Sequence, residues 1–415
     1  MNVRASPSIC LYSGTHYTSL AIARTAHNNP YAPGAGTPPP ALTGRHAELA
    51  QFELLLDRLG NAQPEKSMIL TGQRGIGKTV LLERFAETAA ASGWFHDYYE
   101  VTSQSQLAAA LARMTRRILL GMSLKERLKE RATGALKVLK AFTLSAGGVG
   151  LNIDVEAALG KADSGDLTED LRDLLLEVGE VAIDGDTGVV FFLDEVQFVD
   201  KREYEALIVA LHRVAQKKLP VAMVAAGLPL LPQIGGKTKP YAERMFDYRT
   251  IGRLPEAAAN QALVLPAEEL LVAYTAGALA RIYELTEGYA YFLQEYGRRV
   301  WLVADEDEIT REQVDFAHPV VQQYLDEGFF DVRMSGVSRA KRRYLAALAA
   351  LGDGPQRVAD VTQRAGYRTA QQAAPIRDAL IKEALIYSPE RGTVDFTVPQ
   401  CAAYLRRVHP IDDLR

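Results

Sequence analysis

Residues 67–87, SMILTGQRGIGKTVLLERFAE, pass from an apolar run through a glycine-rich segment into apolar residues at helical spacing. The glycine-rich segment has the form Gly72-x-x-x-x-Gly77-Lys78-Thr79. A strand, a loop of this form and a helix in this order surround phosphate oxygens with backbone N–H groups and the positive end of a helix dipole. The apolar strand before the loop predicts a parallel sheet buried on both faces, and therefore an α/β fold.

Each position of this phosphate loop, the Walker A motif, has an expected task. Its glycines permit backbone angles and close approaches that a Cβ would block. Lys78 supplies a charge beside the outer phosphates, and Thr79 offers a hydroxyl to Mg²⁺. A chance match in a glycine-containing turn is the alternative, which the flanking strand and helix disfavour. The predicted nucleotide-binding residues of the loop are Gly72, Gln73, Arg74, Gly75, Ile76, Gly77, Lys78, Thr79 and Val80.

A second chemical element lies in GVVFFLDEVQFVD, residues 188–200. Five consecutive apolar residues predict a central strand, and Asp194 and Glu195 stand at its carboxyl end, where open α/β sheets place their ligands. We expect Asp194 to hold Mg²⁺ together with Thr79, and Glu195 to polarise the water that attacks the γ-phosphate. A strand ending in a solvated acidic pair is the alternative. Combined with the phosphate loop, this Walker B pattern predicts an ATP hydrolase with ATP and Mg²⁺ as cofactors.

Composition narrows the class of protein. A chain of 415 residues with ordinary apolar and charged fractions is expected to form two or three globular domains. No apolar run has transmembrane length, so we expect no membrane partner. Cys10 and Cys401 are the only cysteines, which excludes a disulfide framework and zinc-ligand spacing and favours a cytoplasmic protein. Residues 1–40 predict a disordered or extended arm, because proline and glycine are frequent from residue 29 and no hydrophobic signal core precedes them.

Further strands are expected at 95–101, 220–229 and 247–254. Residues 122–168 are interpreted as an insertion with a basic helix and a candidate hairpin that turns at Gly147-Gly148. The basic helix most simply presents a solvated face, and a contact with a partner or with DNA is the alternative. Aromatic residues at helical spacing in the later helical region are expected to form core rather than a base-stacking platform: Tyr289, Phe292, Tyr296 and Trp301.

The segments LTGRHAEL, GQRGIGKT, VVFFLDEVQ, VAMVAAGLPLLP and YAERMFDYRTIGRL, in this order, resemble AAA+ ATPases of the origin-recognition-complex-like group. The resemblance covers about residues 29–409. It implies a P-loop ATPase domain over 41–254 with an inserted strand, a helical lid over 255–335 and a C-terminal winged helix over 336–409. It also implies contacts to the adenine base by Leu42, Thr43 and Arg45, although a surface arginine at a helix start is the alternative for Arg45.

The same resemblance implies an arginine that reaches the γ-phosphate of a neighbouring subunit, where a guanidinium would stabilise the charge of the transferred group. Arg244 lies nearest that place, Arg249 is the rival, and an ordinary salt bridge is the alternative for both. Two departures from the group favour a slow nucleotide switch over a fast motor. The fourth predicted strand, at 220–229, has AAG near its end without a polar sensor residue. Residues 286–297 lack the sensor arginine, with Ala290 where a related lid signature has proline.

The C-terminal segment predicts three helices followed by a hairpin, the order of a winged helix-turn-helix. Residues 336–409 carry an excess of about six positive charges, although the whole chain has a net charge of −4. A basic module on an acidic body favours binding of double-stranded DNA. The residues expected to contact DNA lie at the start of the third helix, further along it and at the tip of the hairpin: Arg368, Thr369, Gln371, Gln372, Arg377 and Arg391.

Other functions remain open at this point. The alternative is a signalling or defence regulator whose winged helix is an autoinhibitory or protein-docking module, with a protein partner or self-association. A P-loop kinase is a third interpretation. The adjacent Asp194 and Glu195, with no evident acceptor site, count against it.

Overall fold

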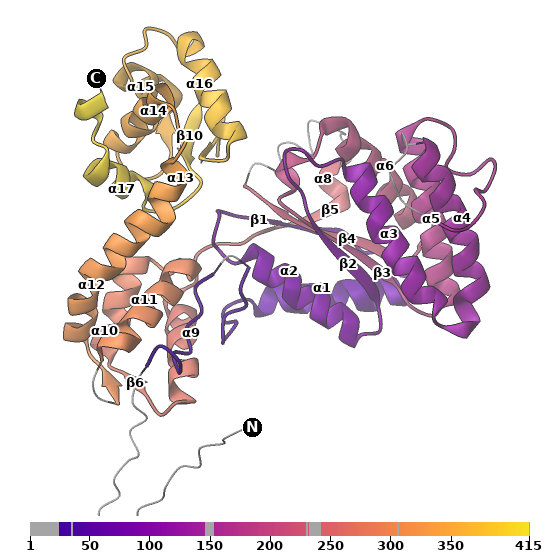
Figure 1. Cartoon of the computed structure of the whole chain (residues 1–415), viewed down its shortest axis with the longest axis horizontal. Coiled ribbons are helices and arrows are strands. Elements are labelled where there is room, and N and C mark those ends of the chain that lie inside the picture. The colour runs from indigo at the N-terminus through magenta and orange to yellow at the C-terminus, as the bar shows by residue number, and fades with distance from the viewer. Residues whose placement is uncertain are drawn as a thin grey trace, which may run out of the picture.

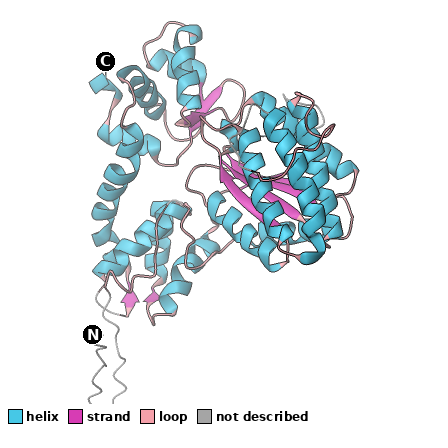
Figure 2. Ribbon diagram, turned by 45° about the vertical axis from the view of Figure 1, so that its right-hand side comes forward, coloured by secondary structure: helices cyan, strands magenta, loops and turns pink. Residues whose placement is uncertain are grey.

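The computed structural model describes residues 25–34, 36–145, 153–229, 231, 242–304 and 307–414. Three parts follow one another along the chain: an α/β core, a helical lid and a C-terminal module (Figure 1). The lid and the C-terminal module lie on the same side of the core (Figure 1). Figure 2 shows that the long strands belong to the core, whereas the lid and the module are mainly helical.

The core contains a five-stranded parallel sheet in the order β2-β3-β4-β1-β5. The predicted strands are therefore present, with β4 lying between the phosphate-loop strand β1 and the acidic strand β3. The strand that separates these two in sequence, β2, lies at the edge of the sheet instead. The bounds are Ser67–Thr71 for β1, Phe95–Glu100 for β2, Val189–Asp194 for β3, Val221–Gly227 for β4 and Phe246–Thr250 for β5.

Helices cover both faces of this sheet. Met68 and Leu70 of β1 belong to a buried cluster with α1 and α2, while Ile69 between them belongs to a second cluster with α3, α4, α5 and α6. This alternation follows from the period of two in a strand, and it explains why the central strands are apolar throughout. The core helices are α1 (His46–Gly60), α2 (Lys78–Ala91), α3 (Leu107–Ser123), α4 (Lys129–Ser145), α5 (Leu167–Asp184), α6 (Lys201–Gln216) and α8 (Ala242–Met245), with single turns η1 (Glu126–Leu128) and η2 (Val196–Phe198).

The predicted insertion is part of the second helical layer. Its basic helix, α4, packs between α3 and α5 and is helical through Ser145, so the expected first arm of a hairpin there is wrong. Leu136, Leu139 and Phe142 are buried at helical spacing, which explains why the helix continues where a strand was expected. The predicted turn at Gly147-Gly148 lies outside the described residues.

The lid is a group of helices closed by a two-stranded pair. Its aromatic side chains Tyr289, Phe292, Tyr296 and Trp301 are at most 2% exposed, which confirms that they form core. The last long helix continues through a π-helical turn, η3, into α13, and we call this continuous segment 311–334 the junction helix. The bounds are α9 (Glu256–Glu268), β6 (Ala273–Tyr274), α10 (Ala276–Thr286), α11 (Ala290–Val303), β7 (Glu308–Ile309), α12 (Arg311–Leu325), η3 (Asp326–Asp331) and α13 (Val332–Met334).

The C-terminal module contains the helices and the hairpin that the sequence predicts, in that order. A small sheet in the order β8-β10-β9 joins the hairpin to the segment before the second helix. The elements are α14 (Arg339–Ala350), β8 (Gln356–Arg357), α15 (Val358–Arg364), α16 (Ala370–Lys382), β9 (Ile386–Tyr387), β10 (Thr393–Phe396), α17 (Cys401–Val408) and η4 (Ile411–Leu414).

The described part of the N-terminal arm has neither helix nor strand before α1, as the sequence predicts. It lies against the lid. Tyr31 is 3% exposed, its hydroxyl donates to the Leu263 carbonyl oxygen at 2.6 Å, and its ring packs edge-on against Trp301. Residues 1–24 lie outside the described part of the chain. Among the described residues, no helix combines the length and the apolar character that a membrane span requires.

Candidate nucleotide site between core and lid

The phosphate loop joins β1 to α2, and its geometry depends on glycine. Gly77 has φ of 100° and α2 begins at the next residue, so the first backbone N–H groups of the helix are left for a ligand. A Cβ on Gly72 would lie 2.5 Å from the Ile251 carbonyl oxygen. A Cβ on Gly75, where φ is +74°, would lie 2.4 Å from the Tyr289 hydroxyl. The close approaches predicted for this loop are therefore made to the end of the sheet and to the lid.

Lys78 is buried and its ammonium group bridges the loop. Its Nζ donates to the carbonyl oxygens of Gly72 at 3.0 Å and Gln73 at 2.9 Å. Burial lowers the pKa of Lys78 to about 8. Because phosphate oxygens favour the charged form, an anion in this loop would raise that pKa again.

The aspartate of the acidic strand meets the threonine of the phosphate loop. Thr79 Oγ1 donates to Asp194 Oδ2 at 2.6 Å, and the Tyr98 hydroxyl donates to the same oxygen at 3.1 Å. Burial, followed by the neighbouring Asp194, raises the pKa of Tyr98, so its hydroxyl stays a donor. Tyr98 lies on β2 beside β3, and no sequence motif marks it as a site residue.

These two oxygen groups suit Mg²⁺. Magnesium is commonly held by one or two protein oxygens together with phosphates and water, and Thr79 and Asp194 supply a hydroxyl and a carboxylate at hydrogen-bond distance from one another. No cluster of three or more His, Cys, Asp or Glu side chains able to hold a metal occurs in the described ranges. The residues present therefore fit a metal that the nucleotide helps to bind rather than a protein-only metal site.

Glu195 has an unusual backbone conformation and is held by its neighbours. Its φ of 53° and ψ of 36° lie in the left-handed region, which costs a non-glycine residue free energy and often marks a functional position. Gln197 donates through Nε2 to Glu195 Oε2, and its own Oε1 accepts from the Leu228 N–H at 3.1 Å, just beyond β4. Gln197 therefore ties the carboxylate to the end of the neighbouring strand, a contact that the sequence analysis did not identify.

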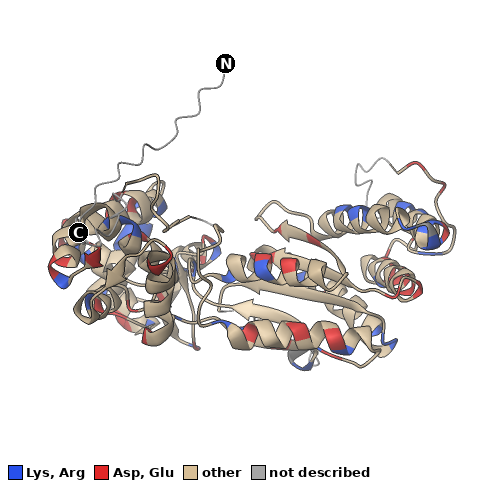
Figure 3. Ribbon diagram, turned by 90° about the horizontal axis from the view of Figure 1, so that it is seen from below, with Lys and Arg blue, Asp and Glu red and all other residues tan. Residues whose placement is uncertain are grey.

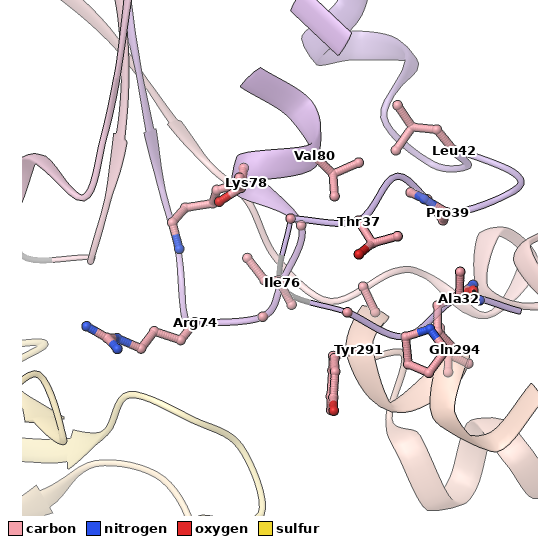
Figure 4. A pocket seen from close by; sticks show the side chains of 18 of the residues that line it. Ala32, Thr37, Pro39, Leu42, Arg74, Ile76, Lys78, Val80, Tyr291 and Gln294 are labelled. Carbon is pink, nitrogen blue, oxygen red and sulfur yellow. Dashed lines mark hydrogen bonds between the residues drawn. The ribbon is translucent and has the colours of Figure 1, made fainter. Parts of the chain in front are cut away.

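A cavity of about 520 Å³ opens beside the loop, between the core, the N-terminal arm and the lid. This volume is ordinary for a small-molecule site. Figure 4 shows Thr37, Pro39 and Leu42 on one side of the loop, with Tyr291 and Gln294 of the lid beneath it. The predicted loop residues from Arg74 to Val80 line the cavity, as do Asp194 and Glu195, whereas Gly72 and Gln73 are not among its lining residues.

All three residues expected to contact the adenine base line the cavity, but their polar contacts differ. Leu42 lines the cavity. Arg45 also lines it but is 6% exposed, with Nη2 donating to the carbonyl oxygens of Ile76 at 3.3 Å and Gly252 at 2.7 Å, and burial lowers its pKa. The alternative of a surface arginine is wrong, because this guanidinium holds the phosphate loop. Thr43 donates to the Ala258 carbonyl oxygen at 2.7 Å and so joins the core to the lid.

The two arginines considered for a neighbouring subunit lie away from the cavity. Arg244 is exposed on α8, and Arg249 pairs with Asp247 at 2.6 Å. Neither lines the cavity of its own chain. A contact of Arg244 with the nucleotide of another subunit stays a prediction.

Four of the predicted DNA-contacting residues lie together at the start of α16. Arg368, Thr369, Gln371 and Gln372 are exposed there, and the Thr369 hydroxyl caps the helix by accepting from the Gln372 N–H at 3.4 Å. The other two residues lie elsewhere on the module. Arg377 pairs with Asp378 at 2.8 Å further along α16, and Arg391 is exposed between β9 and β10.

Comparison with known proteins supports the assignment of the core. Residues 41–224 match the family model of the AAA ATPase domain, and residues 327–405 match a domain of unknown function, DUF8462. A Walker-type ATPase of Pyrococcus abyssi is similar in structure with 15% identity, a TM-score of 0.53 and coverage of 88% of this chain and 96% of that one. The comparison with curated proteins gave no match.

Two further neighbours have lower structural scores. The ORC1 protein of Aeropyrum pernix in complex with DNA has 16% identity, a TM-score of 0.43 and coverage of 90% of this chain and 95% of that one. The RuvB Holliday junction branch migration motor of Thermotoga maritima has 14% identity, a TM-score of 0.42 and coverage of 88% and 95%.

In this parallel sheet, one strand lies between the strand that leads into the phosphate loop and the acidic strand. This arrangement, with the loop and the acidic residues in contact, defines the class of P-loop ATPases. Within that class, residues 41–224 match the AAA ATPase domain model, which confirms the predicted AAA+ core and its chemistry of ATP hydrolysis.

Proposed function

We propose that this chain is a slow Mg-dependent ATPase that acts as a nucleotide switch and controls docking of its C-terminal module on double-stranded DNA. The observation that carries the switch is a contact between distant parts of the chain. The backbone N–H of Arg74 in the phosphate loop donates to the carbonyl oxygen of Thr397 in the module at 3.2 Å. Movement of the loop when phosphates bind or leave is therefore transmitted directly to the module.

The roles at the site follow from the geometry described above. ATP binds with its phosphates at the loop and the start of α2, where Lys78 supplies charge. Thr79 and Asp194 hold Mg²⁺, and Glu195 polarises the attacking water. Leu42 and the arm contact the base. Slow turnover is supported by β4, which ends at Gly227 without a polar side chain directed at the phosphates.

The basic residues of the module support DNA binding at a restricted surface. Several of them are engaged within the protein: Lys341 pairs with Glu383, Arg406 with Asp353 and Arg407 with Asp326. Figure 3 shows that Lys and Arg positions alternate with Asp and Glu positions along the ribbon of the module. Arg368 and Arg391 are exposed and have no ion pair with a described residue, so the start of α16 and the hairpin tip are among the surfaces available for phosphate contacts.

A salt titration of duplex binding tests this proposal. If about four to six phosphates are neutralised, the logarithm of affinity falls against the logarithm of salt concentration with a slope of about −4 to −5. Changing Arg368, Arg377 and Arg391 together to Ala is expected to weaken binding at least about tenfold, since each hydrogen bond to a phosphate contributes roughly 1 kcal/mol. The matched control changes Arg84, Arg202 and Arg213 of the core to Ala, which removes the same charge elsewhere and leaves binding nearly unchanged.

The second candidate function is a regulatory ATPase whose module restrains the loop and does not bind DNA. It is favoured by a second contact near the same place, in which Gln400 Nε2 donates to the Leu285 carbonyl oxygen of the lid at 2.8 Å. Absence of salt-sensitive DNA binding by the full chain, with the triple variant behaving like the parent, would replace the first function by this one.

A further inference from the structure

Two arginines that are far apart in sequence line the nucleotide cavity. Arg74 belongs to the phosphate loop, and Arg333 belongs to α13 at the end of the junction helix. The Nε–H groups of both are buried without a hydrogen-bond partner in the described part of the chain. Each unpaired buried donor costs free energy, so this pair of guanidinium groups favours an anionic ligand in the cavity.

The protein compensates these two charges only partly. Arg74 Nη2 lies 4.0 Å from Glu195 Oε2. Arg333 donates through Nη1 to the Phe329 carbonyl oxygen at 2.7 Å and lies over the Phe329 ring at 3.7 Å, but it forms no ion pair with a described residue. Burial, the largest cause, and the nearby positive charge of Arg74 both lower the pKa of Arg333. Of the two guanidinium groups, only that of Arg74 thus has a carboxylate partner among the described residues.

The position of Arg333 is fixed by the π-helical turn before it. Within η3, Phe329 stacks on Tyr291 of the lid with centroids 4.9 Å apart, and Phe330 stacks on Tyr404 of α17 at the same distance. π-helical turns are rare and frequently occur at functional sites. This turn directs one aromatic ring toward the cavity side and the next toward the module, so Arg333 follows a segment packed against both.

We propose that Arg333, together with Arg74, binds the terminal phosphate of a nucleoside triphosphate in the cavity. Arg74 lies beside Glu195, the residue assigned to the water that attacks that phosphate, and a guanidinium group presents several donors to phosphate oxygens. The inference rests on the proposed function and deepens it, because it assigns recognition of triphosphate over diphosphate to the segment that connects the lid with the module. Figure 4 shows the Arg74 side chain extending from the loop away from Tyr291 and Gln294.

Calorimetric titration of the full chain with Mg-ATP and with Mg-ADP tests this inference. Arg333→Ala is expected to weaken ATP binding at least about tenfold, because a hydrogen bond to a charged phosphate group is lost. ADP lacks that phosphate, so its binding is expected to weaken less than about threefold. Arg333→Lys retains the charge without the planar fork and is expected to recover part of the difference. The control is Arg298→Ala, an exposed arginine of α11 that does not line the cavity, and it leaves both affinities unchanged.

The outcomes separate this inference from the proposed function. A parent protein that binds neither nucleotide would contradict the proposed function itself. A parent that binds both, while Arg333→Ala binds ATP as tightly as before or loses ATP and ADP equally, would overturn only the assignment to the terminal phosphate. Retained ADP binding by Arg333→Ala also shows that the variant is folded.

Discussion

Glu195 combines a strained backbone with a restrained side chain. Its left-handed conformation persists because β3 ends directly before it and Gln197 fixes its carboxylate against the end of β4. Such a carboxylate is pre-organised, which is the property that a residue positioning an attacking water requires. Gln197 then acts through Glu195 as a positioning residue.

Substitution of these two residues distinguishes their roles. Glu195→Gln is expected to retain ATP binding and to lower the hydrolysis rate at least about 100-fold, because the amide keeps the shape and loses the charge that polarises water. Gln197→Leu is expected to lower the rate about tenfold with little change in ATP affinity. Single-turnover hydrolysis and calorimetric binding measure both effects.

The double variant provides the control for this pair. If Gln197 acts only through Glu195, adding Gln197→Leu to Glu195→Gln causes no further loss of rate. Fully multiplicative losses in the double variant would show that Gln197 contributes by a separate route. Unchanged hydrolysis in Glu195→Gln would remove that residue from the mechanism.

The site residues that could be predicted from the sequence lie within local sequence motifs. The phosphate loop is continuous, and Asp194 and Glu195 follow a run of buried residues, so each could be found from a local pattern. Tyr98 and Arg333 reach the site only through the order of the strands and the path of the junction helix. Gln197 follows Glu195 by two residues, but its bond to Leu228 depends on the position of β4. No local pattern marks such residues, because their contacts are formed by tertiary packing.

At the scale of elements, the N-terminal arm is the segment whose position was hardest to predict from its sequence. Proline and glycine correctly predicted the absence of helix and strand, but not the side on which the arm lies. Tyr31 anchors the arm on the lid through its hydroxyl bonds to Leu263 at 2.6 Å and Tyr274 at 2.8 Å. The arm beyond Tyr31 then forms a wall of the cavity, including Pro33 and Pro39.

Release of this anchor is expected to affect both stability and nucleotide binding. Tyr31→Ala removes a buried aromatic side chain and should lower the free energy of unfolding by about 3 kcal/mol or more. Tyr31→Phe keeps the ring and should cost only about 1 kcal/mol. Chemical denaturation measures these losses, and ATP titration is expected to show weaker binding for Tyr31→Ala than for Tyr31→Phe. Equal ATP affinity in the parent and Tyr31→Ala would exclude the arm as a wall of the binding site.

At the scale of the whole molecule, one hydrophobic core continues from the α1 and α2 side of the sheet through the lid into the module. The helical layer of α3 to α6 belongs to the separate core on the other face. Packed side chains therefore connect the side of the sheet that carries the phosphate loop with the module, whereas the predicted insertion lies on the opposite face. The sequence predicts three parts, but the two polar contacts that join the module to the loop and the lid depend on three-dimensional docking.

Gln400 offers a direct test of this coupling. Its backbone is left-handed at φ of 61°, and its side chain reaches the Leu285 carbonyl oxygen of the lid at 2.8 Å. Gln400→Asn keeps an amide that tolerates this conformation but is too short for the same bond. Loss of one hydrogen bond is worth roughly 1 kcal/mol, so docking weakens by about 2- to 10-fold.

In the proposed switch, a docked module restrains the phosphate loop through the Arg74 to Thr397 bond, so weaker docking is expected to raise the rate of ATP hydrolysis by up to the same factor. The matched control is Gln363→Asn on α15, an exposed glutamine for which no change is expected. Steady-state phosphate release measures the rate, and denaturation of each variant shows that the fold is kept. By linkage, a nucleotide that loosens docking must itself bind more tightly to Gln400→Asn than to the parent. A variant with the parent's hydrolysis rate and nucleotide affinities would show that the module and the ATPase site are not coupled through this interface.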